Sequence, residues 1–109
     1  MFYTISHFTR LSVTTGFYFT SNTEAIALSE KIAAANPGPL VLLGSHSYED
    51  KSRLKSVFMQ KWVSQDAYNA WRTANVALLN QYDSERAAFN TANGITVSEV
   101  DITTDEILF

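Results

Sequence analysis

The segment VFMQKWVSQDAYNAW, residues 57–71, decides the fold, because a strand ends within it at Trp62 and a helix starts almost at once. Its first part is rich in large apolar and aromatic residues, which is typical of a strand. Ser64 offers a side-chain oxygen to the free backbone N–H groups of a helix start, and Asp66 places a negative charge at the positive end of the helix dipole. We therefore predict a strand over about residues 54–63 that passes directly into a helix.

The helix that follows Ser64 has an apolar face, and its length is open. Helical composition continues toward Ala92, and Asn93-Gly94 is a C-terminal stop signal. A second helix could start at residues 83–85, so residues 64–93 form either one long kinked helix or two shorter ones. Four residues at helical spacing share the apolar face: Ala67, Trp71, Ala74 and Leu78.

Two extended segments precede the first helix. Residues 4–13 are rich in β-branched and aromatic side chains and predict a strand. Gly16 then breaks the pattern, since glycine readily adopts positive φ. Residues 17–20 are again extended and aromatic, and the sequence leaves open whether they pair as a strand or pack as a loop. The apolar residues on one parity of the first strand are Ile5, Leu11 and Val13.

A capping box at Ser21–Glu24 starts the first helix, because the Ser oxygen and the Glu side chain each satisfy free backbone N–H groups. Apolar residues follow at helical spacing as far as Ala35, and Asn36-Pro37-Gly38 ends the helix. Residues 39–48 begin apolar on both parities, as a strand buried on both faces would. A charged turn at residues 49–53 leads into the third strand.

The last predicted strand covers residues 95–102, and we expect the acidic tail to Phe109 to be loosely held. The element order is then strand, helix, strand, strand, helix, strand. This is the split βαβ arrangement of an α+β domain, with an antiparallel sheet and both helices on one face. In a monomer the other face of the sheet would be exposed to water. The third predicted strand nevertheless has apolar side chains on both faces, with Val57 on one and Phe58 and Trp62 on the other. Two sheets packed face to face resolve this conflict, so we expect a homodimer.

Composition limits the partners and the setting. The chain of 109 residues forms a single domain over residues 1–109, and 46% hydrophobic against 17% charged content leaves apolar surface for a partner. A net charge of -3 with scattered Lys and Arg argues against nucleic acid. The absence of cysteine excludes disulfides and thiol nucleophiles and fits a cytoplasmic setting. No apolar run is long enough to span a bilayer, so we expect no membrane partner.

The junction from Trp62 to Trp71 resembles the segment W-x-S-x-x-A-[FY]-x-x-[WH] of the antibiotic-biosynthesis-monooxygenase-like family of dimeric α+β barrels. Gly38 before the second strand and the polar turn at residues 49–53 match further features of that family in order, so the resemblance covers about residues 24–102. It implies a ferredoxin-like fold, a homodimer whose two sheets form a barrel, and a pocket in each subunit between the sheet and the helices.

The resemblance also implies classes of activity. Family members include cofactor-independent oxygenases of aromatic polyketides, heme-degrading enzymes and quinol-directed oxygenases. The heme-degrading branch has an Asn on the first strand, near the place of Ser6 and His7, and a His about three turns after the Trp that Trp71 matches. Gln81 stands in place of that His. We therefore expect no heme and no other cofactor.

The two histidines are the candidates for proton transfer, because no other side chains here ordinarily titrate near neutral pH. His7 is the predicted catalytic residue, as a proton acceptor toward an activated phenol or carbonyl compound, because it lies on the first strand. The alternative for His7 and for His46 is a strand histidine satisfied by the backbone or by water. No H-x-x-x-H spacing occurs, and we expect no metal ligand.

A binding site for a small hydrophobic molecule is predicted around the junction. Trp62 and Trp71 could stack on a planar ligand or belong to the core. Gln60 shares a parity with Phe58 and Trp62, and a polar group within an apolar wall needs a partner. The predicted ligand-binding residues are Phe58, Gln60, Trp62, Tyr68 and Trp71.

The sequence leaves two functions open. In the first, the protein is a cofactor-independent monooxygenase-like enzyme whose pocket desolvates a small hydrophobic substrate, while His7 or a Tyr helps to form the enolate. In the second, it is a carrier that holds a fatty acid or an aromatic compound without converting it. An enzyme needs a titratable group and an ordered donor inside the pocket, whereas a carrier needs an apolar cavity with one polar anchor.

Overall fold

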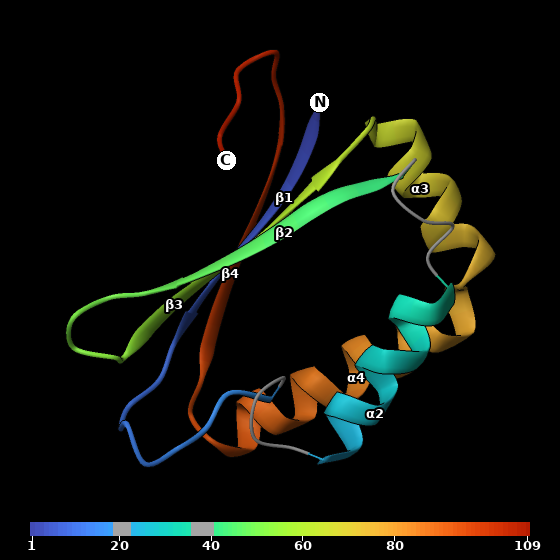
Figure 1. Cartoon of the computed structure of the whole chain (residues 1–109). Helices are drawn as coiled ribbons and strands as arrows, with labels where there is room; N and C mark the ends of the chain where they lie inside the picture. The colour runs from blue at the N-terminus through green and yellow to red at the C-terminus, as the bar shows by residue number, and fades with distance from the viewer. Residues whose placement is uncertain (19–22, 36–40) are drawn as a thin grey trace.

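One antiparallel sheet with helices on one side forms the domain, as Figure 1 shows for this computed structural model. The structure describes residues 1–18, 23–35 and 41–109. Along the sheet the strand order is β2-β3-β1-β4, and all neighbouring strands are antiparallel. This confirms the predicted α+β class and split βαβ topology. The described elements are β1 Phe2–Thr9, α2 Thr23–Ala35, β2 Leu42–Glu49, β3 Lys55–Trp62, α3 Gln65–Ala74, α4 Val76–Ala92 and β4 Thr96–Thr103.

The strand-to-helix junction has the predicted cap. The Ser64 hydroxyl oxygen accepts a hydrogen bond of 3.1 Å from the Ala67 backbone N–H, and Asp66 lies in the first turn of α3. The segment after it forms two helices, but the second starts at Val76 and not at residues 83–85, because the Asn75 backbone leaves helical geometry at φ −116° and ψ 26°. Its backbone N–H and its side-chain amide both donate to the Trp71 carbonyl oxygen, at 3.1 and 3.0 Å, which is the local competition that makes Asn a poor helix-interior residue. None of the described helices has the length and apolar composition needed to cross a membrane.

The first strand is shorter than predicted. It ends at Thr9, and the chain turns at Arg10, whose buried guanidinium donates to the carbonyl oxygens of Arg53 and Thr15, both at 2.8 Å. These bonds hold the chain against the hairpin between β2 and β3, so Leu11 leaves the sheet and is 81% exposed. The prediction that Leu11 lies on the same face of the first strand as Ile5 is therefore wrong.

Several predictions for residues 17–38 are only partly testable in the described structure. Phe17 and Tyr18 are buried and lie outside the strands, while the rest of that segment is not described. The described part of the first helix starts at Thr23, and the Ser21 cap lies outside the described residues. The stop at residues 36–38 lies outside them as well.

Two apolar clusters fill opposite ends of the space between sheet and helices. One joins Phe2 and Trp62 of the sheet to Trp71 and Leu79 of the helices. The other is formed by Phe8, Phe17 and Ile95. Aromatic rings bury large areas and keep the layers apart at both ends. The space between the two clusters is therefore not filled by core side chains.

The face of the sheet that points away from the helices, called the outer face below, is partly covered by the chain after β4. Tyr3 of β1 is fully buried there, and its hydroxyl donates to the Glu106 carbonyl oxygen at 3.3 Å and accepts from the Leu108 backbone N–H at 3.2 Å. The Lys61 ammonium donates to the Phe109 backbone oxygen at 2.9 Å. The tail is therefore packed on the sheet, and the expectation of a loosely held tail is wrong.

Helix α4 ends as predicted, at Asn93-Gly94, with Gly94 in the left-handed region at φ +66°. We expect Gly94→Ala to lower the free energy of unfolding by about 1 kcal/mol, because an L-residue is strained in this conformation. A Cβ at this position would also lie 2.8 Å from Leu11 Cδ1, but that side chain is exposed and free to move. Urea denaturation of the single variant and of the Gly94→Ala/Leu11→Ala pair separates the two causes. Recovery of full stability in the pair would show that the contact, and not the backbone, carries the cost.

Candidate functional site

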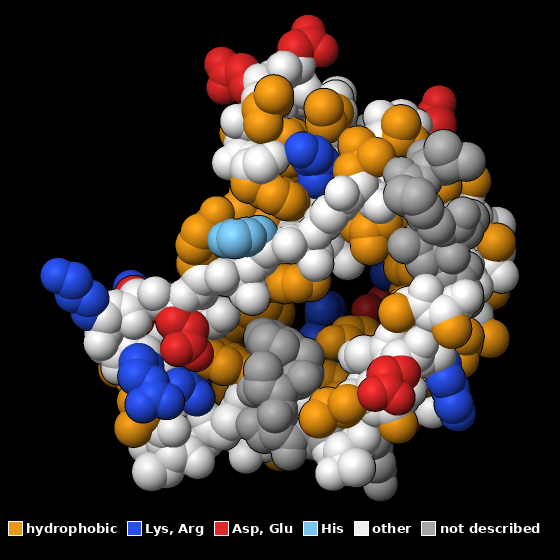
Figure 2. All heavy atoms as spheres, in the orientation of Figure 1, with side chains coloured by type: hydrophobic (Ala, Val, Ile, Leu, Met, Phe, Trp, Pro, Cys, Tyr) orange, Lys and Arg blue, Asp and Glu red, His pale blue; other side chains and the backbone are white. Residues whose placement is uncertain are grey.

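A cavity of about 610 Å³ lies between the sheet and helices α2, α3 and α4, in the gap between the two apolar clusters. Figure 2 shows a hollow at the centre of the molecule, with charged side chains at its depth. This is the usual size of a site for a small organic molecule. Its walls combine aromatic rings with polar side chains from both the sheet and the helices.

A row of polar side chains crosses all four strands on the floor of the cavity. Gln60 of β3 pairs with Ser45 of β2 on one side and with Thr4 of β1 on the other, and Thr4 pairs in turn with Asp101 of β4. All four residues line the cavity. The Thr4 hydroxyl donates to Gln60 Oε1 at 3.2 Å. The four residues Ser45, Gln60, Thr4 and Asp101 are called the polar row below.

The rows on either side of the polar row carry aromatic side chains. Trp62 and Phe2 form a cross-strand pair toward α3, and Phe58 and Ser6 form the corresponding pair on the other side. Glu99 of β4 extends this second row. The polar row is therefore flanked by ring faces, an arrangement that suits a flat ligand with polar groups along one edge.

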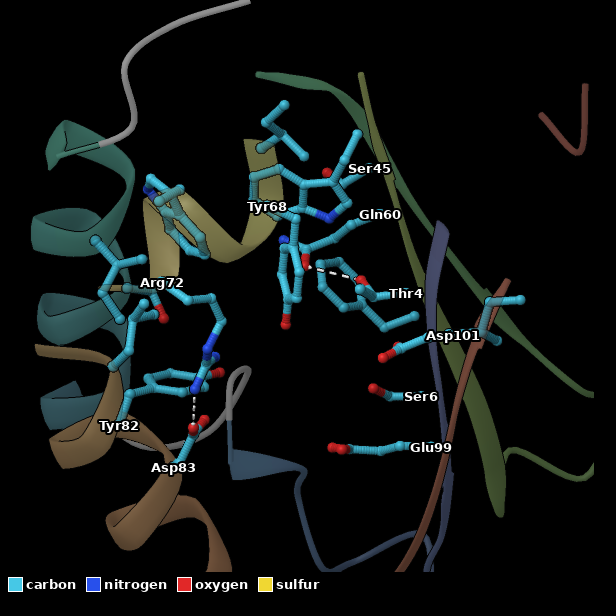
Figure 3. Close-up of a pocket in the computed structure, with 18 of the residues that line it drawn as sticks. Thr4, Ser6, Ser45, Gln60, Tyr68, Arg72, Tyr82, Asp83, Glu99 and Asp101 are labelled. Carbon is cyan, nitrogen blue, oxygen red and sulfur yellow. Dashed lines mark hydrogen bonds and ion pairs between the residues drawn. The ribbon is translucent and has the colours of Figure 1, made fainter. Parts of the chain in front are cut away.

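The helical wall brings two half-buried phenols, those of Tyr68 and Tyr82, to the cavity. Burial raises the pKa of the Tyr68 hydroxyl, and the nearby Arg72 guanidinium opposes this only in part. Burial also raises the pKa of Tyr82. Both phenols are therefore neutral at physiological pH and can donate a hydrogen bond. Figure 3 shows Tyr68 and Arg72 facing Thr4, Gln60 and Asp101 across the cavity.

Ion pairs connect the helical wall to the edge of the sheet. The Arg72 guanidinium of α3 donates to the Asp83 carboxylate of α4 at 2.7 Å. Arg86 lies 3.8 Å from Asp83 and donates to Glu99 of β4 at 3.0 Å. These groups are partly exposed, so each pair adds little to stability. Asp101 also lines the cavity, and it forms no ion pair within the described part of the chain.

The two tryptophans pack against each other beside the cavity. Their ring centroids are 4.8 Å apart, and Tyr68 lies 5.0 Å from the Trp62 ring. Both indole N–H groups are buried without a hydrogen-bond partner among the described residues. An unpaired buried donor costs about 1–3 kcal/mol, so the indoles are held by the packing of their rings. They serve as both core and cavity wall.

All five residues predicted to bind a ligand line this cavity: Phe58, Gln60, Trp62, Tyr68 and Trp71. His7 does not join them. It is exposed and pairs with Val57 and Ser98 on the outer face of the sheet. His46 lies on the same face, with its ring 4.4 Å from that of Tyr48. The catalytic role of His7 stays a prediction, and His7 does not line this cavity.

Other lining residues were not found from the sequence. Thr4 and Asp101 join Gln60 only through strand register, which one sequence does not display. Arg72 directly follows Trp71 on α3, and that adjacency was the available signal. Gln81, which stands where the heme-degrading branch has a His, is exposed and donates to Glu85 at 3.2 Å. Within residues 1–18, 23–35 and 41–109, no three His, Asp or Glu side chains are grouped as a metal site.

Comparison with known proteins rests on structure. The sequence matches no protein-family model, and a search of curated proteins found no relative. A variant of SnoaB, a cofactor-independent oxygenase from Streptomyces nogalater, has a TM-score of 0.62 at 14% identity, over 98% of this chain and 95% of that one. A dimeric ferredoxin-like protein from an uncultured marine organism has a TM-score of 0.62 at 11% identity, over 98% and 97%. An antibiotic biosynthesis monooxygenase has a TM-score of 0.55 at 10% identity, over 97% and 100%.

These alignments span nearly the whole of each chain, so the likeness concerns the complete domain. At such low identity the likeness is one of fold, and the predicted ferredoxin-like architecture is confirmed. The structural resemblance agrees with the one carried by the Trp62–Trp71 segment. The chain has the fold of antibiotic-biosynthesis-monooxygenase-like and dimeric ferredoxin-like proteins.

Proposed function

We propose that this protein binds a small, mainly apolar molecule in the central cavity and oxidises it with O₂ as a cofactor-independent monooxygenase. The observation that carries the proposal is the cavity of about 610 Å³, with aromatic rings around one row of polar side chains. Apolar walls supply affinity through burial, and a few fixed polar groups orient the ligand. The likeness to a cofactor-independent oxygenase supports this choice of reaction.

Oxidation without a cofactor requires a substrate that supplies its own electrons. An activated CH₂ group conjugated with a ring carbonyl loses a proton, to a carboxylate of the cavity wall or to water, and gives an enolate, which passes electrons to O₂. The CH₂ then becomes a carbonyl group, and the second oxygen atom leaves as water. Hydrogen-bond donors that face the enolate oxygen favour the first step. Tyr68, kept neutral by burial, and Arg72 are donors of this kind on the helical wall.

The second candidate is a carrier that binds the same class of compound without oxidising it. The observation that favours it is the position of His7 outside the cavity, which leaves no imidazole among the cavity-lining residues. Carboxylates are then the anionic groups in the described cavity wall. A carrier needs only the apolar walls and one polar anchor.

We further propose a homodimer that forms through the outer face of the sheet. Val100 of β4 is 47% exposed on this face, and Ile5, Val57 and Met59 form half-buried apolar neighbours. No described helix covers these residues. An apolar sheet face left in water is unfavourable, and a second copy removes it from solvent. Two matched structures are described as dimeric.

Oxygen uptake distinguishes the enzyme from the carrier. We expect the purified protein to accelerate O₂ consumption by anthrone, a flat tricyclic ketone with an activated CH₂ group. Tyr68→Phe should lower kcat about 10- to 100-fold, because one donor to the enolate is lost while the ring packing is kept. Tyr48→Phe, at an exposed tyrosine on the outer face, is the matched control and should have no effect. Saturable anthrone binding with no oxygen uptake would favour the carrier.

The dimer is tested by one added charge. We expect light scattering to give about twice the chain mass of 12.2 kDa for the wild type and one chain mass for Val100→Glu. Burying an unpaired carboxylate in an apolar interface is strongly unfavourable. Val76→Glu is the matched control, since Val76 is 53% exposed at the start of α4, on the helical side. A monomeric wild type, or a Val100→Glu variant that stays dimeric, would contradict this interface.

A further inference from the structure

Three carboxylates from the described part of the chain line the cavity, and they differ in what their oxygens contact. The Asp83 carboxylate accepts from Arg72 at 2.7 Å and lies 3.8 Å from Arg86. The Glu99 carboxylate accepts from Arg86 at 3.0 Å. Asp101 has neither an ion pair nor a hydrogen-bond partner among the described side chains. A carboxylate whose lone pairs already face a guanidinium is a weaker proton acceptor than a free one, so Asp101 is the best placed of the three to take a proton.

Strand register places Asp101 at the end of the polar row. It pairs with Thr4 of β1, and the Thr4 hydroxyl is hydrogen-bonded to Gln60 on its other side at 3.2 Å. Asp101 is exposed, so water solvates its charge while the cavity is open, and the unpaired carboxylate has no burial cost to offset. A ligand that fills the cavity displaces this water. The carboxylate is then desolvated, which favours its taking a proton.

The Tyr68 phenol faces Asp101 from the helical wall. Figure 3 shows the two side chains pointing into the cavity from opposite sides. Burial is the main cause of the raised pKa of Tyr68, and the negative charge of Asp101 adds to it. The two groups are therefore close enough to act on one ligand. A hydrogen-bond donor stands on the helices and a proton acceptor on the sheet.

We propose that Asp101 is the general base of the cavity and removes the proton from the activated CH₂ group, while Tyr68 donates a hydrogen bond to the enolate oxygen that forms. This rests on the proposed function, because it assigns a residue to a step of the same reaction. An aspartate is a sufficient base for proton abstraction activated by a carbonyl group where fixed donors stabilise the enolate. Asp101 takes the role that was predicted for His7, which lies on the outer face of the sheet.

The reaction gives Asp101 two proton transfers. In the first, a C–H bond of the CH₂ group breaks, its electron pair stays in the enolate, and the carboxylate takes the proton. The enolate passes one electron to O₂, the two radicals combine to a peroxide anion on that carbon, and the anion recovers the proton from Asp101. In the second, Asp101 takes the remaining C–H proton, the C–H electron pair forms the carbonyl bond, and the O–O bond breaks. The departing hydroxide accepts this proton and leaves as water.

Deuterium exchange without oxygen isolates the first proton transfer. Anthrone in anaerobic D₂O buffer gains deuterium at its CH₂ group only when a proton is removed and a deuteron returns, and mass spectrometry measures the gain. We expect the wild type to accelerate this exchange over buffer alone, and Asp101→Asn to lower the acceleration about 100-fold or more. The amide has nearly the shape of the carboxylate, so calorimetric titration should show anthrone binding within about threefold of the wild type.

Further variants separate a missing base from a damaged fold. In Asp101→Ala, sodium formate supplies a small carboxylate to the vacated space and should raise the exchange rate in proportion to its concentration, whereas sodium chloride should not. Asp101→Glu keeps the carboxylate and should exchange at least about tenfold faster than Asp101→Asn. Asp105→Asn is the matched control, because it removes the same charge from an exposed position outside the cavity, and it should exchange like the wild type.

The outcomes distinguish this assignment from the proposed function. Undiminished exchange in Asp101→Asn with anthrone still bound would overturn the assignment and identify water or another carboxylate as the acceptor, and the proposed function would stand. Loss of exchange in Glu99→Gln, with none in Asp101→Asn, would overturn it in favour of Glu99. A wild type that binds anthrone without faster exchange and without oxygen uptake would overturn the assignment and support the carrier. A wild type that does not bind anthrone would overturn the assignment and the proposed oxidation together.

Discussion

The contact between Trp62 and Trp71, with ring centroids 4.8 Å apart, is the constraint on which the rest of the domain depends. One ring ends β3 and the other belongs to the second turn of α3, so their packing fixes the angle at which the helical layer leaves the sheet. A second cluster around Phe8 and Ile95 supports the other end. Because core side chains do not fill the space between these two clusters, a cavity remains there. Large-to-small changes in such a core are costly because the layers collapse only in part.

Five charged side chains line the cavity, yet little of their charge acts on a ligand. Arg72, Asp83, Arg86 and Glu99 are joined in a chain of ion pairs from α3 to β4, and Asp101 is outside that chain. Partial exposure lets water screen the linked groups, so little of their charge reaches the ligand. The orienting forces are then hydrogen bonds. This favours a neutral ligand with polar atoms at set positions over an anion held by charge.

The sequence predicted elements better than it predicted the site. The Ser64 cap, the Gly94 stop and the split βαβ order follow from local chemistry, because each depends on a few adjacent residues. The five residues predicted to bind a ligand all line the cavity, because they lie on one strand-to-helix segment. Thr4 and Asp101 were missed because their meeting depends on register across three strands.

Strand register also decides which candidate side chains meet the cavity at all. In β1, Thr4 and Ser6 line the cavity while His7 faces outward, since side chains alternate along a strand. A slip of one residue would exchange the two sets.

The irregularity in β2 between Leu42 and Gly44 also decides which side chains face the cavity. With Leu42 opposite Trp62 and Gly44 opposite Lys61, one extra residue is accommodated, and Ser45 instead of Gly44 lies opposite Gln60. Gly44 then faces outward, where a Cβ would lie 3.6 Å from the Phe109 ring. One inserted residue thus completes the polar row on the inner face and places Gly44 beside the tail on the outer face.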